Sequence, residues 1–304
     1  MALRSLDNAL PIALERPKKQ PKSSAISTPS LIKQTDIAMN DENKAPCNVP
    51  PQTLEASIEY ILSENLKPLT DPETKIQGLV GGLESKDWLV VCESLNDVRR
   101  FALFHFSILQ PLLEKVLMVI VKAMKNPRSA LCKTSIMASS DIFKAAGDIL
   151  LELPDSSDAF QNVMLQLLMK ASQDKKFVCE EAEKALKTLV DSLTPLPLLQ
   201  KLRANVSHSN MRVRAKAAVS ISNCVSKMEQ EETKEFGLVE LIKIAANMLN
   251  DRLPEARDAA RKIIVLLYEA VTKDEEEKHE SWQNFCQENL SATDTQAMVK
   301  LVSS

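Results

Sequence analysis

The stretch VMLQLLMKASQDKKFVCEEAEKALKTLV, residues 163–190, decides the fold class. It is an apolar run, a short polar segment and a second apolar run. The residues of the second run that recur at helical spacing are Phe177, Ala182, Ala185, Leu186 and Leu189. This spacing predicts one buried stripe along an amphipathic helix. Residues 163–190 are therefore expected to form two helices joined by a tight turn.

The same pattern recurs along the chain. Five short polar breaks each separate two apolar-periodic stretches: GLESKDW (82–88), MKNPRS (124–129), SQDKKF (172–177), SHSNMR (207–212) and LNDRLPEAR (249–257). Markers taken in the breaks are Trp88, Arg128, Lys176, Arg212 and Arg252, which lie 40, 48, 36 and 40 residues apart. This spacing is close to the roughly 40 to 47 residues of HEAT-type helix pairs. The sequence predicts an all-α fold, an α-solenoid of about five or six HEAT-type helical hairpins.

The composition favours the same fold. The 304 residues exceed the usual size of a single hydrophobic core, so either two domains or a repeat array is expected. Only 5 glycines and 4% aromatic residues leave little material for turns or strands, whereas helix-forming residues are abundant. A helical repeat array is the better interpretation.

Three segments differ in composition. Residues 1–50 are rich in Pro, Ser, Lys and Asn and include the basic cluster RPKKQPK (16–22), so they are predicted to be a disordered arm. Residues 51–272 hold the repeats. Residues 273–304 are expected to form a short capping helix and a tail, because end repeats need an atypical outer face. A protruding helix that binds a partner is the alternative for this last segment.

Charge and hydropathy exclude two classes of partner. A net charge of -3 argues against a general nucleic-acid binder, which needs a strongly basic domain. No apolar run approaches the 18 or more residues needed to span a bilayer, and no secretory signal is expected at the N-terminus. We therefore expect neither nucleic acid nor a membrane as partner.

The residues that carry enzyme chemistry are scattered. The six cysteines are too far apart for metal ligation and are typical of free thiols in a reducing, cytoplasmic compartment. The three histidines lie in different units, and no Gly-rich phosphate loop, GxSxG or HExxH motif occurs. The expectation is a protein that is not an enzyme and has no cofactor or metal.

The turns inside the hairpins carry the most distinctive residues. Hairpins of a solenoid stack side by side, so equivalent turns line up along one edge and form a surface for a partner. The predicted binding residues on this edge are Lys86, Trp88, Arg128, Lys175, Lys176, Arg212 and Arg252. Trp and Arg are frequent hot spots of protein interfaces, and a basic series complements an acidic protein face. A protein partner is indicated.

Each of these residues also has an ordinary structural interpretation. Trp88 could pack beneath the first turn as a hydrophobic anchor, and Lys or Arg in turns are normally just solvated. Arg214 and Arg257, which lie a turn into their second helices, are expected to bridge neighbouring repeats.

At these turns the sequence resembles a TOG domain, a HEAT array that binds tubulin, and most closely the TOG domains of the crescerin and CLASP group. The resemblance covers roughly residues 54–270. Its carriers are ESKDWLVVCESLNDVRRFALFH (84–105), NPRSALCKTS (126–135), LLMKASQDKKFVCEEAEKAL (167–186), SHSNMRVRAKAA (207–218) and NDRLPEARDAARKII (250–264). Two positions depart from the pattern: Cys179 stands where related sequences commonly have Arg, and Pro254 alters the last turn.

The resemblance implies a microtubule-associated protein in the cytoplasm whose row of turns grips the αβ-tubulin dimer. Trp88 and the neighbouring basic residues would face β-tubulin, and the later turns would face α-tubulin. The alternative is a HEAT or armadillo-like adaptor that binds a different protein.

Overall fold

The structure is a computed structural model, which describes residues 60–153 and 158–303. The chain divides into two units, residues 1–54 and 55–304, and every described residue belongs to the second unit. The predicted N-terminal arm, residues 1–50, lies outside the described residues.

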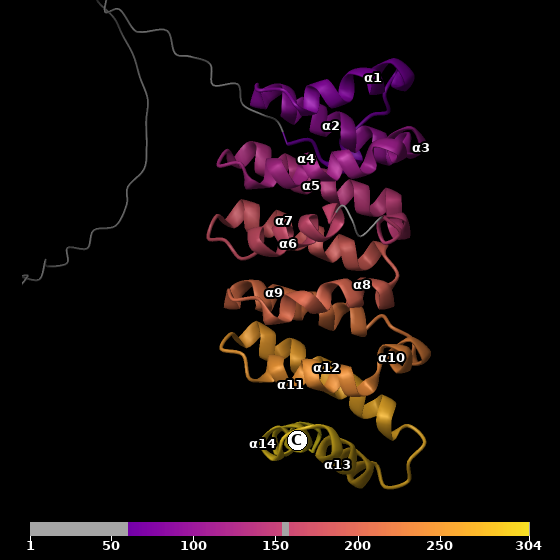
Figure 1. Ribbon diagram of the computed structural model, residues 1–304, viewed down its shortest axis with the longest axis vertical. Helices are drawn as coiled ribbons and strands as arrows, with labels where there is room; N and C mark the ends of the chain where they lie inside the picture. The colour runs from indigo at the N-terminus through magenta and orange to yellow at the C-terminus, as the bar shows by residue number, and fades with distance from the viewer. Residues whose placement is uncertain (1–59, 154–157, 304) are drawn as a thin grey trace, which may run out of the picture. The chain divides into compact units, whose positions relative to one another are not determined.

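Helices pair into six hairpins in the described part of the second unit, and no strand occurs there (Figure 1). The pairs are α1 (Pro72–Leu83) with α2 (Trp88–Phe104), α4 (Leu113–Lys125) with α5 (Ser129–Ala146), α6 (Ala159–Lys170) with α7 (Lys176–Ser192), α8 (Pro195–Leu202) with α9 (Met211–Val225), α11 (Leu238–Leu249) with α12 (Pro254–Thr272), and α13 (Lys278–Asn289) with α14 (Ala292–Val302). Short helices between or beside the pairs are α3 (Phe106–Leu109) and α10 (Gln230–Phe236), with 3₁₀ turns η1 (Ser63–Asn65), η2 (Gln110–Leu112), η3 (Gly147–Leu150) and η5 (Arg203–Ser207). The predicted all-α solenoid of five or six hairpins is confirmed.

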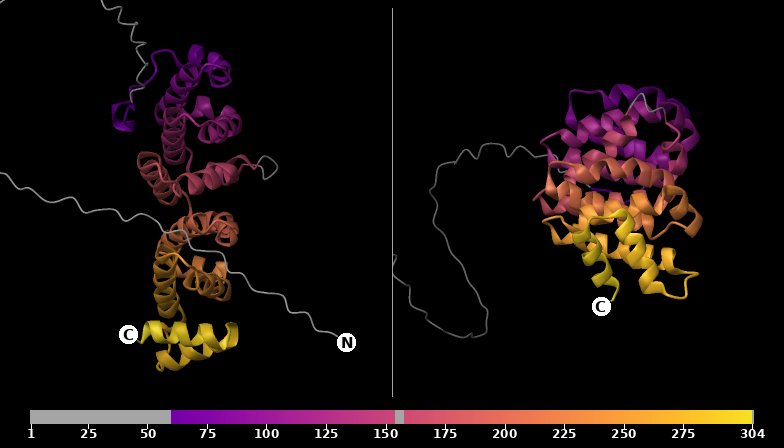
Figure 2. Two further views of the ribbon diagram at one scale, coloured as in Figure 1. Left: turned by 90° about the vertical axis from the view of Figure 1, so that its left-hand side faces the viewer. Right: turned by 60° about the horizontal axis from the view of Figure 1, so that its bottom comes forward.

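The hairpins stack in chain order, as Figures 1 and 2 show. The second helices α2, α5 and α7 pack side by side, and so do α9 and α12, whereas α7 and α9 touch less extensively. One continuous apolar core runs from Leu79 in α1 to Met298 in α14. Each hairpin thus buries its apolar faces against its neighbours, which is the physical reason why repeats of this kind need one another.

The C-terminal segment forms two helices, where the sequence analysis expected one capping helix. The second helix, α14, begins at a capping signal, because the Ser291 hydroxyl accepts a hydrogen bond from Asp294 N at 3.2 Å. Trp282 on α13 is fully buried, and its ring stacks on Phe285 with centroids 5.9 Å apart. Residues 278–302 therefore make a sixth hairpin that covers the end of α12.

A short segment before α1 lies across the second helices of the first two hairpins. Arg99 on α2 and Asp141 on α5 are fully buried and form an ion pair of 2.7 Å. Arg99 donates to the carbonyl of Ile61 at 2.8 Å, and the Ser63 hydroxyl donates to Asp141 at 2.6 Å. Residues 60–66 are therefore held on this face by a buried polar network.

No helix in residues 60–153 and 158–303 has both the length and the apolar character needed to cross a membrane.

Candidate protein-binding edge

The turns inside the hairpins follow one another along one side of the stack, which is the left side in Figure 1 for the second to fifth hairpins. We call this surface the turn edge and define it by the five turns with the first two residues of the helix after each. The turns are residues 84–87, 126–128, 171–175, 208–210 and 250–253.

Four of the five turns share a local hydrogen bond that fixes the start of the second helix. In each, an Asp or Asn side chain accepts from the backbone N–H two residues later, which is an Asx turn. The pairs are Asp87 with Leu89 (2.9 Å), Asn126 with Arg128 (2.9 Å), Asn210 with Arg212 (2.9 Å) and Asp251 with Leu253 (3.0 Å). The repeated Asp and Asn of the polar breaks therefore set the backbone from which the marker residues project.

Trp88 and Arg128 come together at the first two turns. Trp88 is half-buried and packs against the core, while the Arg128 guanidinium lies over its ring, 4.9 Å from the centroid. Beside the ring is a hollow of about 100 Å³, lined in part by Lys86 and Asn126. Trp88 is thus both an anchor of the first turn and an accessible part of the turn edge.

The third turn reaches the second through Lys175, whose ammonium donates to the Ser129 hydroxyl at 3.2 Å. The side chain of Lys176 is 88% exposed and lies 3.8 Å from Glu180, one helical turn away. Phe177 is 44% exposed, so its assignment to the buried stripe was wrong. Val178, which is 2% exposed, occupies that stripe, because it falls in helical register with the buried residues that follow.

The fourth turn reaches the third through Arg212. Its guanidinium lies 2.7 Å from the Asp174 carboxylate, and both side chains are exposed. Arg252 in the fifth turn is also exposed, and its side chain makes no ion pair or hydrogen bond with any residue in the described ranges. Arg252 and Lys86, which is likewise exposed and unpaired within the described residues, are therefore the least constrained of the predicted binding residues.

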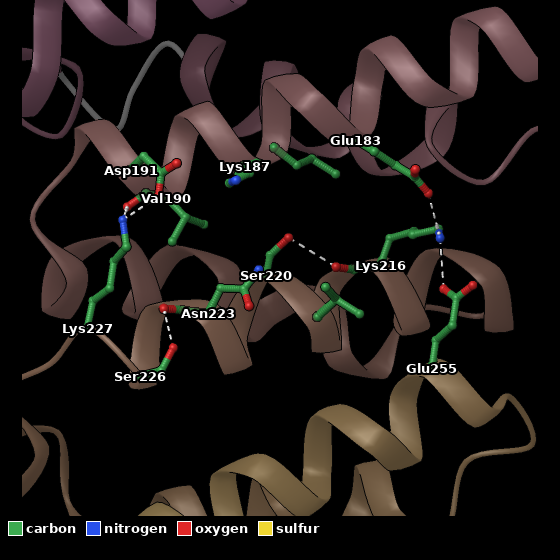
Figure 3. Close-up of a pocket in the computed structure, with 12 residues that line it drawn as sticks. Glu183, Lys187, Val190, Asp191, Lys216, Ser220, Asn223, Ser226, Lys227 and Glu255 are labelled. Atoms are coloured by element: carbon green, nitrogen blue, oxygen red, sulfur yellow. Dashed lines mark hydrogen bonds and ion pairs between the residues drawn. The ribbon is translucent and has the colours of Figure 1, made fainter.

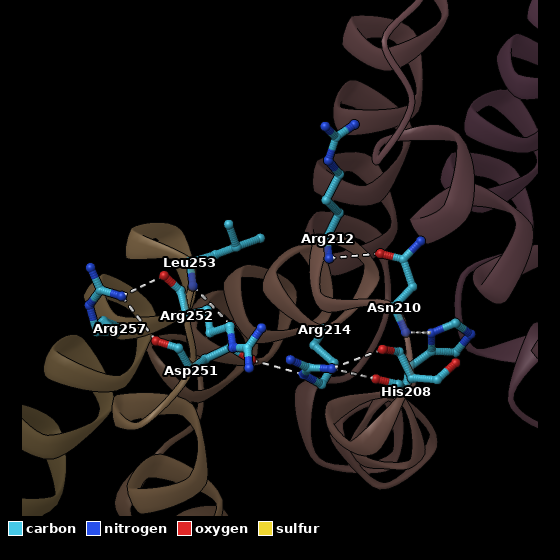
Figure 4. Close-up of polar contacts among 9 residues, drawn as sticks. His208, Asn210, Arg212, Arg214, Asp251, Arg252, Leu253 and Arg257 are labelled. Atoms are coloured by element: carbon cyan, nitrogen blue, oxygen red, sulfur yellow. Dashed lines mark hydrogen bonds and ion pairs between the residues drawn. The ribbon is translucent and has the colours of Figure 1, made fainter. Parts of the chain in front are cut away.

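Arg214 and Arg257 have the two structural tasks that Figure 4 shows. Arg214 on α9 lies 2.8 Å from Asp251 and donates to the carbonyl of His208 at 2.9 Å, so it bridges the fourth and fifth hairpins as predicted. Arg257 donates to the carbonyls of Asp251 and Arg252 at 3.0 and 2.8 Å. It therefore closes its own turn, and the expected bridge to a neighbouring repeat was wrong for this residue.

The Asp251 carboxylate accepts bonds both from its own turn and from Arg214 of the neighbouring hairpin. Burial alone would raise its pKa, but the hydrogen bond from Leu253 N and the bond and charge of Arg214 together hold the pKa below the ordinary value. Asp251 is therefore ionised at neutral pH and fixes the turn to its neighbour.

The structure brings the predicted residues into one linked row, from Trp88 through Arg128 and Lys175 to Arg212, with Arg252 beyond. The sequence analysis missed the acidic partners Asp174 and Asp251. Both lie in the polar breaks, and that was the available signal, but an acid in a turn has many ordinary explanations.

Thiol chemistry has little support in the described residues. Burial raises the pKa of the Cys92 thiol to about 11 and the pKa values of the Cys224 and Cys286 thiols to about 12. These thiols are protonated at neutral pH and pack as small apolar side chains. No group of three or more His, Cys, Asp or Glu side chains within residues 60–153 and 158–303 could hold a metal ion.

Comparison with known proteins places these observations in a family. The family described as "CLASP N terminal" matches residues 103–290. A mouse protein, TOG array regulator of axonemal microtubules protein 1, is 28% identical over 240 residues, which are 75% of this chain and 13% of the mouse protein. Its human counterpart is 31% identical over 135 residues, 44% of this chain and 7% of that protein. The chain thus spans a small part of the length of these relatives.

Solved structures agree on the fold. A TOG domain of Zyg9 from C. elegans covers 79% of this chain and 90% of its own length, with a TM-score of 0.56 and 17% identity. A structure described under "Crescerin uses a TOG domain array to regulate microtubules in the primary cilium" covers 74% of this chain and 88% of its own, with a TM-score of 0.53 and 16% identity. The family match extends over more than half of the sequence. The chain therefore belongs to the CLASP N-terminal family and has the fold of a TOG domain.

Proposed function

We propose that the turn edge binds the αβ-tubulin dimer and that the protein thereby regulates microtubule organisation or dynamics. The observation that carries the proposal is the stacking of Arg128 on Trp88, because it presents an aromatic anchor and a cation together at an accessible end of the row. Similar structures include one described as TOG-tubulin binding specificity in microtubule dynamics, at a TM-score of 0.53 and 11% identity. The relatives named above are described as regulators of axonemal microtubules.

The charge of the turn edge suits an acidic partner. Six of the predicted residues are basic, and the acids of the turn edge are each engaged. Asp87 caps α2, and the other four form ion pairs: Glu84 with Lys115, Asp174 with Arg212, Asp251 with Arg214 and Glu255 with Lys216. Lys86 and Arg252 are exposed and without an ion pair in the described residues, and Lys176 is exposed with one long ion pair to Glu180, so all three can approach an acidic surface. Complementary charge speeds encounter and fixes orientation, while a buried aromatic anchor supplies more of the affinity.

Further expectations follow from the same proposal. Binding would need no catalysis and no cofactor, and the protein would act in the cytoplasm as a microtubule-associated protein. Neither nucleic acid nor a membrane is expected as a partner.

The test is co-elution of the full chain with tubulin on a sizing column, followed by a titration. Trp88→Ala should weaken binding by about 2 kcal/mol or more, as loss of a buried aromatic anchor typically does. Arg128→Glu and Arg212→Glu should each cost on the order of 1 kcal/mol, and more at low salt, because exposed charges are screened by ions.

Arg261→Glu is the matched control, because Arg261 lies on α12 away from the turns and pairs only with Asp258 in the described part of the chain. It should bind tubulin as the wild type does. Far-UV circular dichroism checks that each variant is folded. A folded Trp88→Ala chain that binds at full strength would show that this surface is wrong, and failure of the wild type to bind tubulin would favour the adaptor interpretation.

A further inference from the structure

The second helices of neighbouring hairpins already hold one short segment of this chain. Residues 60–66 lie across α2 and α5 through Arg99, Asp141 and Ser63, as described above. Ile61 offers its backbone carbonyl to Arg99, and the Leu66 side chain is buried. This face of the repeat can therefore bind a peptide segment through one backbone contact, one polar pair and apolar side chains.

A hollow of about 560 Å³ lies on the second helices farther along the stack, between α7 and α9 (Figure 3). Its apolar lining includes Leu186 and Val190 on α7 and Val219 on α9. Leu186 and Val190 are buried, whereas Val219 is 37% exposed. We call this hollow the α7/α9 groove.

Two polar residues of the α7/α9 groove, Lys187 and Asn223, occupy the positions in their helices that Arg99 and Asp141 occupy in α2 and α5. Lys187 is eleven residues beyond the first residue of α7, as Arg99 is in α2. Asn223 is twelve residues beyond the first residue of α9, as Asp141 is in α5. Both Lys187 and Asn223 line the groove. The repeat therefore places a cation and a polar side chain at the same helix positions in both places, but Arg99 and Asp141 are buried and paired, whereas Lys187 is exposed and Asn223 is half-buried.

The second pair differs from the first in its charge balance. Asp141 neutralises Arg99, whereas Asn223 cannot neutralise Lys187. The other two lysines of the groove are engaged: Lys216 lies 2.8 Å from both Glu183 and Glu255, and Lys227 lies 2.5 Å from Asp191. No residue that the structure describes forms an ion pair or hydrogen bond with the Lys187 ammonium (Figure 3).

We propose that the α7/α9 groove binds a short segment of a partner protein in which aliphatic side chains flank an acidic residue. The acidic group meets Lys187, the Asn223 amide bonds the segment backbone, and an aliphatic side chain lies against Val190 and Val219. This chemistry fits because an acidic side chain would supply the counter-charge that Lys187 lacks, and an aliphatic side chain would cover the apolar lining of the groove. The groove lies on the second helices, and of its lining residues only Glu255 also belongs to the turn edge, so the two surfaces can be tested separately through Lys187.

The experiment uses the full chain and a fluorescent synthetic peptide, YILSENL, which copies residues 60–66 and carries aliphatic residues around Glu64. Fluorescence anisotropy should show saturable binding. Lys187→Glu should weaken it at least tenfold, and so should replacement of the peptide's glutamate by lysine. Asn223→Leu should weaken binding several-fold with no change of charge, which separates the amide contact from the electrostatic one.

Lys184→Glu is the matched control: Lys184 is exposed on the same helix, outside the groove, and its change in charge is identical. It should leave peptide binding within twofold of the wild type. The proposal is overturned if the peptide does not bind, or if the chain self-associates and thereby covers the groove. It is also overturned if Lys187→Glu binds the peptide as well as the wild type does, because the peptide would then be displacing residues 60–66 from α2 and α5. Tubulin binding by Lys187→Glu is measured in parallel and should be unchanged, so the two proposals succeed or fail independently.

Discussion

Arg212 and Arg214 are two residues apart on α9, and their side chains point in different directions (Figure 4). Arg212 is exposed and reaches Asp174 at the outer edge, where an ion pair contributes little to stability. Arg214 lies against Asp251, whose side chain is only 8% exposed, and also bonds backbone carbonyls of its own turn. The two arginines of the RVR step thus divide into one that can exchange its partner for a ligand and one that holds the hairpins together.

The Asp251 contact predicts a stability that depends on pH. Because the folded pKa of Asp251 lies below the ordinary value of 3.8, its contribution is fully present above that value and is lost as the pH falls through the folded pKa. Asp251→Asn should cost about 2 kcal/mol at pH 7, as loss of a charged hydrogen bond typically does. Melting temperatures of wild type and variant, followed by circular dichroism, should converge below pH 3.8. A difference that stays constant down to the lowest pH would show that the charge of Asp251 is not responsible.

At the scale of an element, residues 60–66 are held by the buried Arg99–Asp141 pair. Removing only one of these two charges should destabilise the fold more than removing both. Asp141→Ala should destabilise the fold by about 3–5 kcal/mol, because it leaves the buried Arg99 guanidinium without its counter-charge. The double change Arg99→Met with Asp141→Leu should cost less, since it removes both charges and keeps the volume. Urea denaturation measures both values. A double variant that is less stable than Asp141→Ala would contradict this account of the pair.

The hairpins could be predicted because apolar spacing and polar breaks are local properties of the sequence. One error arose where two neighbouring residues competed for one position, and another where a helix boundary had only a weak signal. Phe177 is larger and more apolar than Val178, but helical register gives the buried stripe to Val178. In the C-terminal segment the cap at Ser291 was too weak a signal beside the sparse apolar residues, so two helices were taken for one.

The candidate site was predictable only in part, because local sequence patterns place residues on a helix or turn but do not show which distant residues they meet. The basic residues and Trp88 could be placed on one edge, because equivalent turns of a repeat must align. Their partners could not, since Asp174 meets Arg212 across 38 residues and Asp251 meets Arg214 across 37. The α7/α9 groove also depends on the separation of two helices, which no local pattern encodes. Whether the turn edge binds tubulin stays a prediction.

At the scale of the described unit, the boundary between the third and fourth hairpins is marked by the groove and by ion pairs. The second helices α2, α5 and α7 pack closely, and so do α9 and α12, whereas α7 with α9 and α12 with α14 touch less extensively. The groove lies between α7 and α9, and ion pairs join the third hairpin to the fourth. These pairs are Arg212 with Asp174, Lys216 with Glu183, and Lys227 with Asp191. The side chains of the Arg212 and Lys227 pairs are exposed, so these two pairs are screened by salt and contribute little. The Lys216 side chain is only 18% exposed, so its pair is the strongest of the three. In a repeat array, stability depends on nearest-neighbour interfaces, so we expect the stack to open first at this boundary, where a groove and ion pairs take the place of apolar contact between second helices.

The fluorescence of the two tryptophans follows the unfolding of the hairpins on opposite sides of that boundary. Trp88 lies in the first hairpin and Trp282 in the sixth, and the sequence contains only these 2. In a Trp282→Phe variant, urea should produce two transitions in far-UV circular dichroism, with the fluorescence of Trp88 following only one. In a Trp88→Phe variant, the fluorescence of Trp282 should follow the other. Each variant is compared with its own dichroism curve, so a change in stability caused by the substitution does not confuse the assignment.

Salt separates this explanation from a mere difference in local stability. Sodium chloride at about 0.5 M shortens the range of electrostatic interactions to a few ångströms, so it should weaken the ion-paired boundary while apolar interfaces such as that of α2 with α5 are retained. The two transitions should therefore move farther apart. Lys216 on α9 pairs with both Glu183 and Glu255, and Lys216→Met removes both ion pairs. This variant should therefore separate the two unfolding transitions even at low salt. If fluorescence and dichroism coincide in both variants at every salt concentration, the six hairpins unfold as one cooperative unit and the boundary has no special weakness.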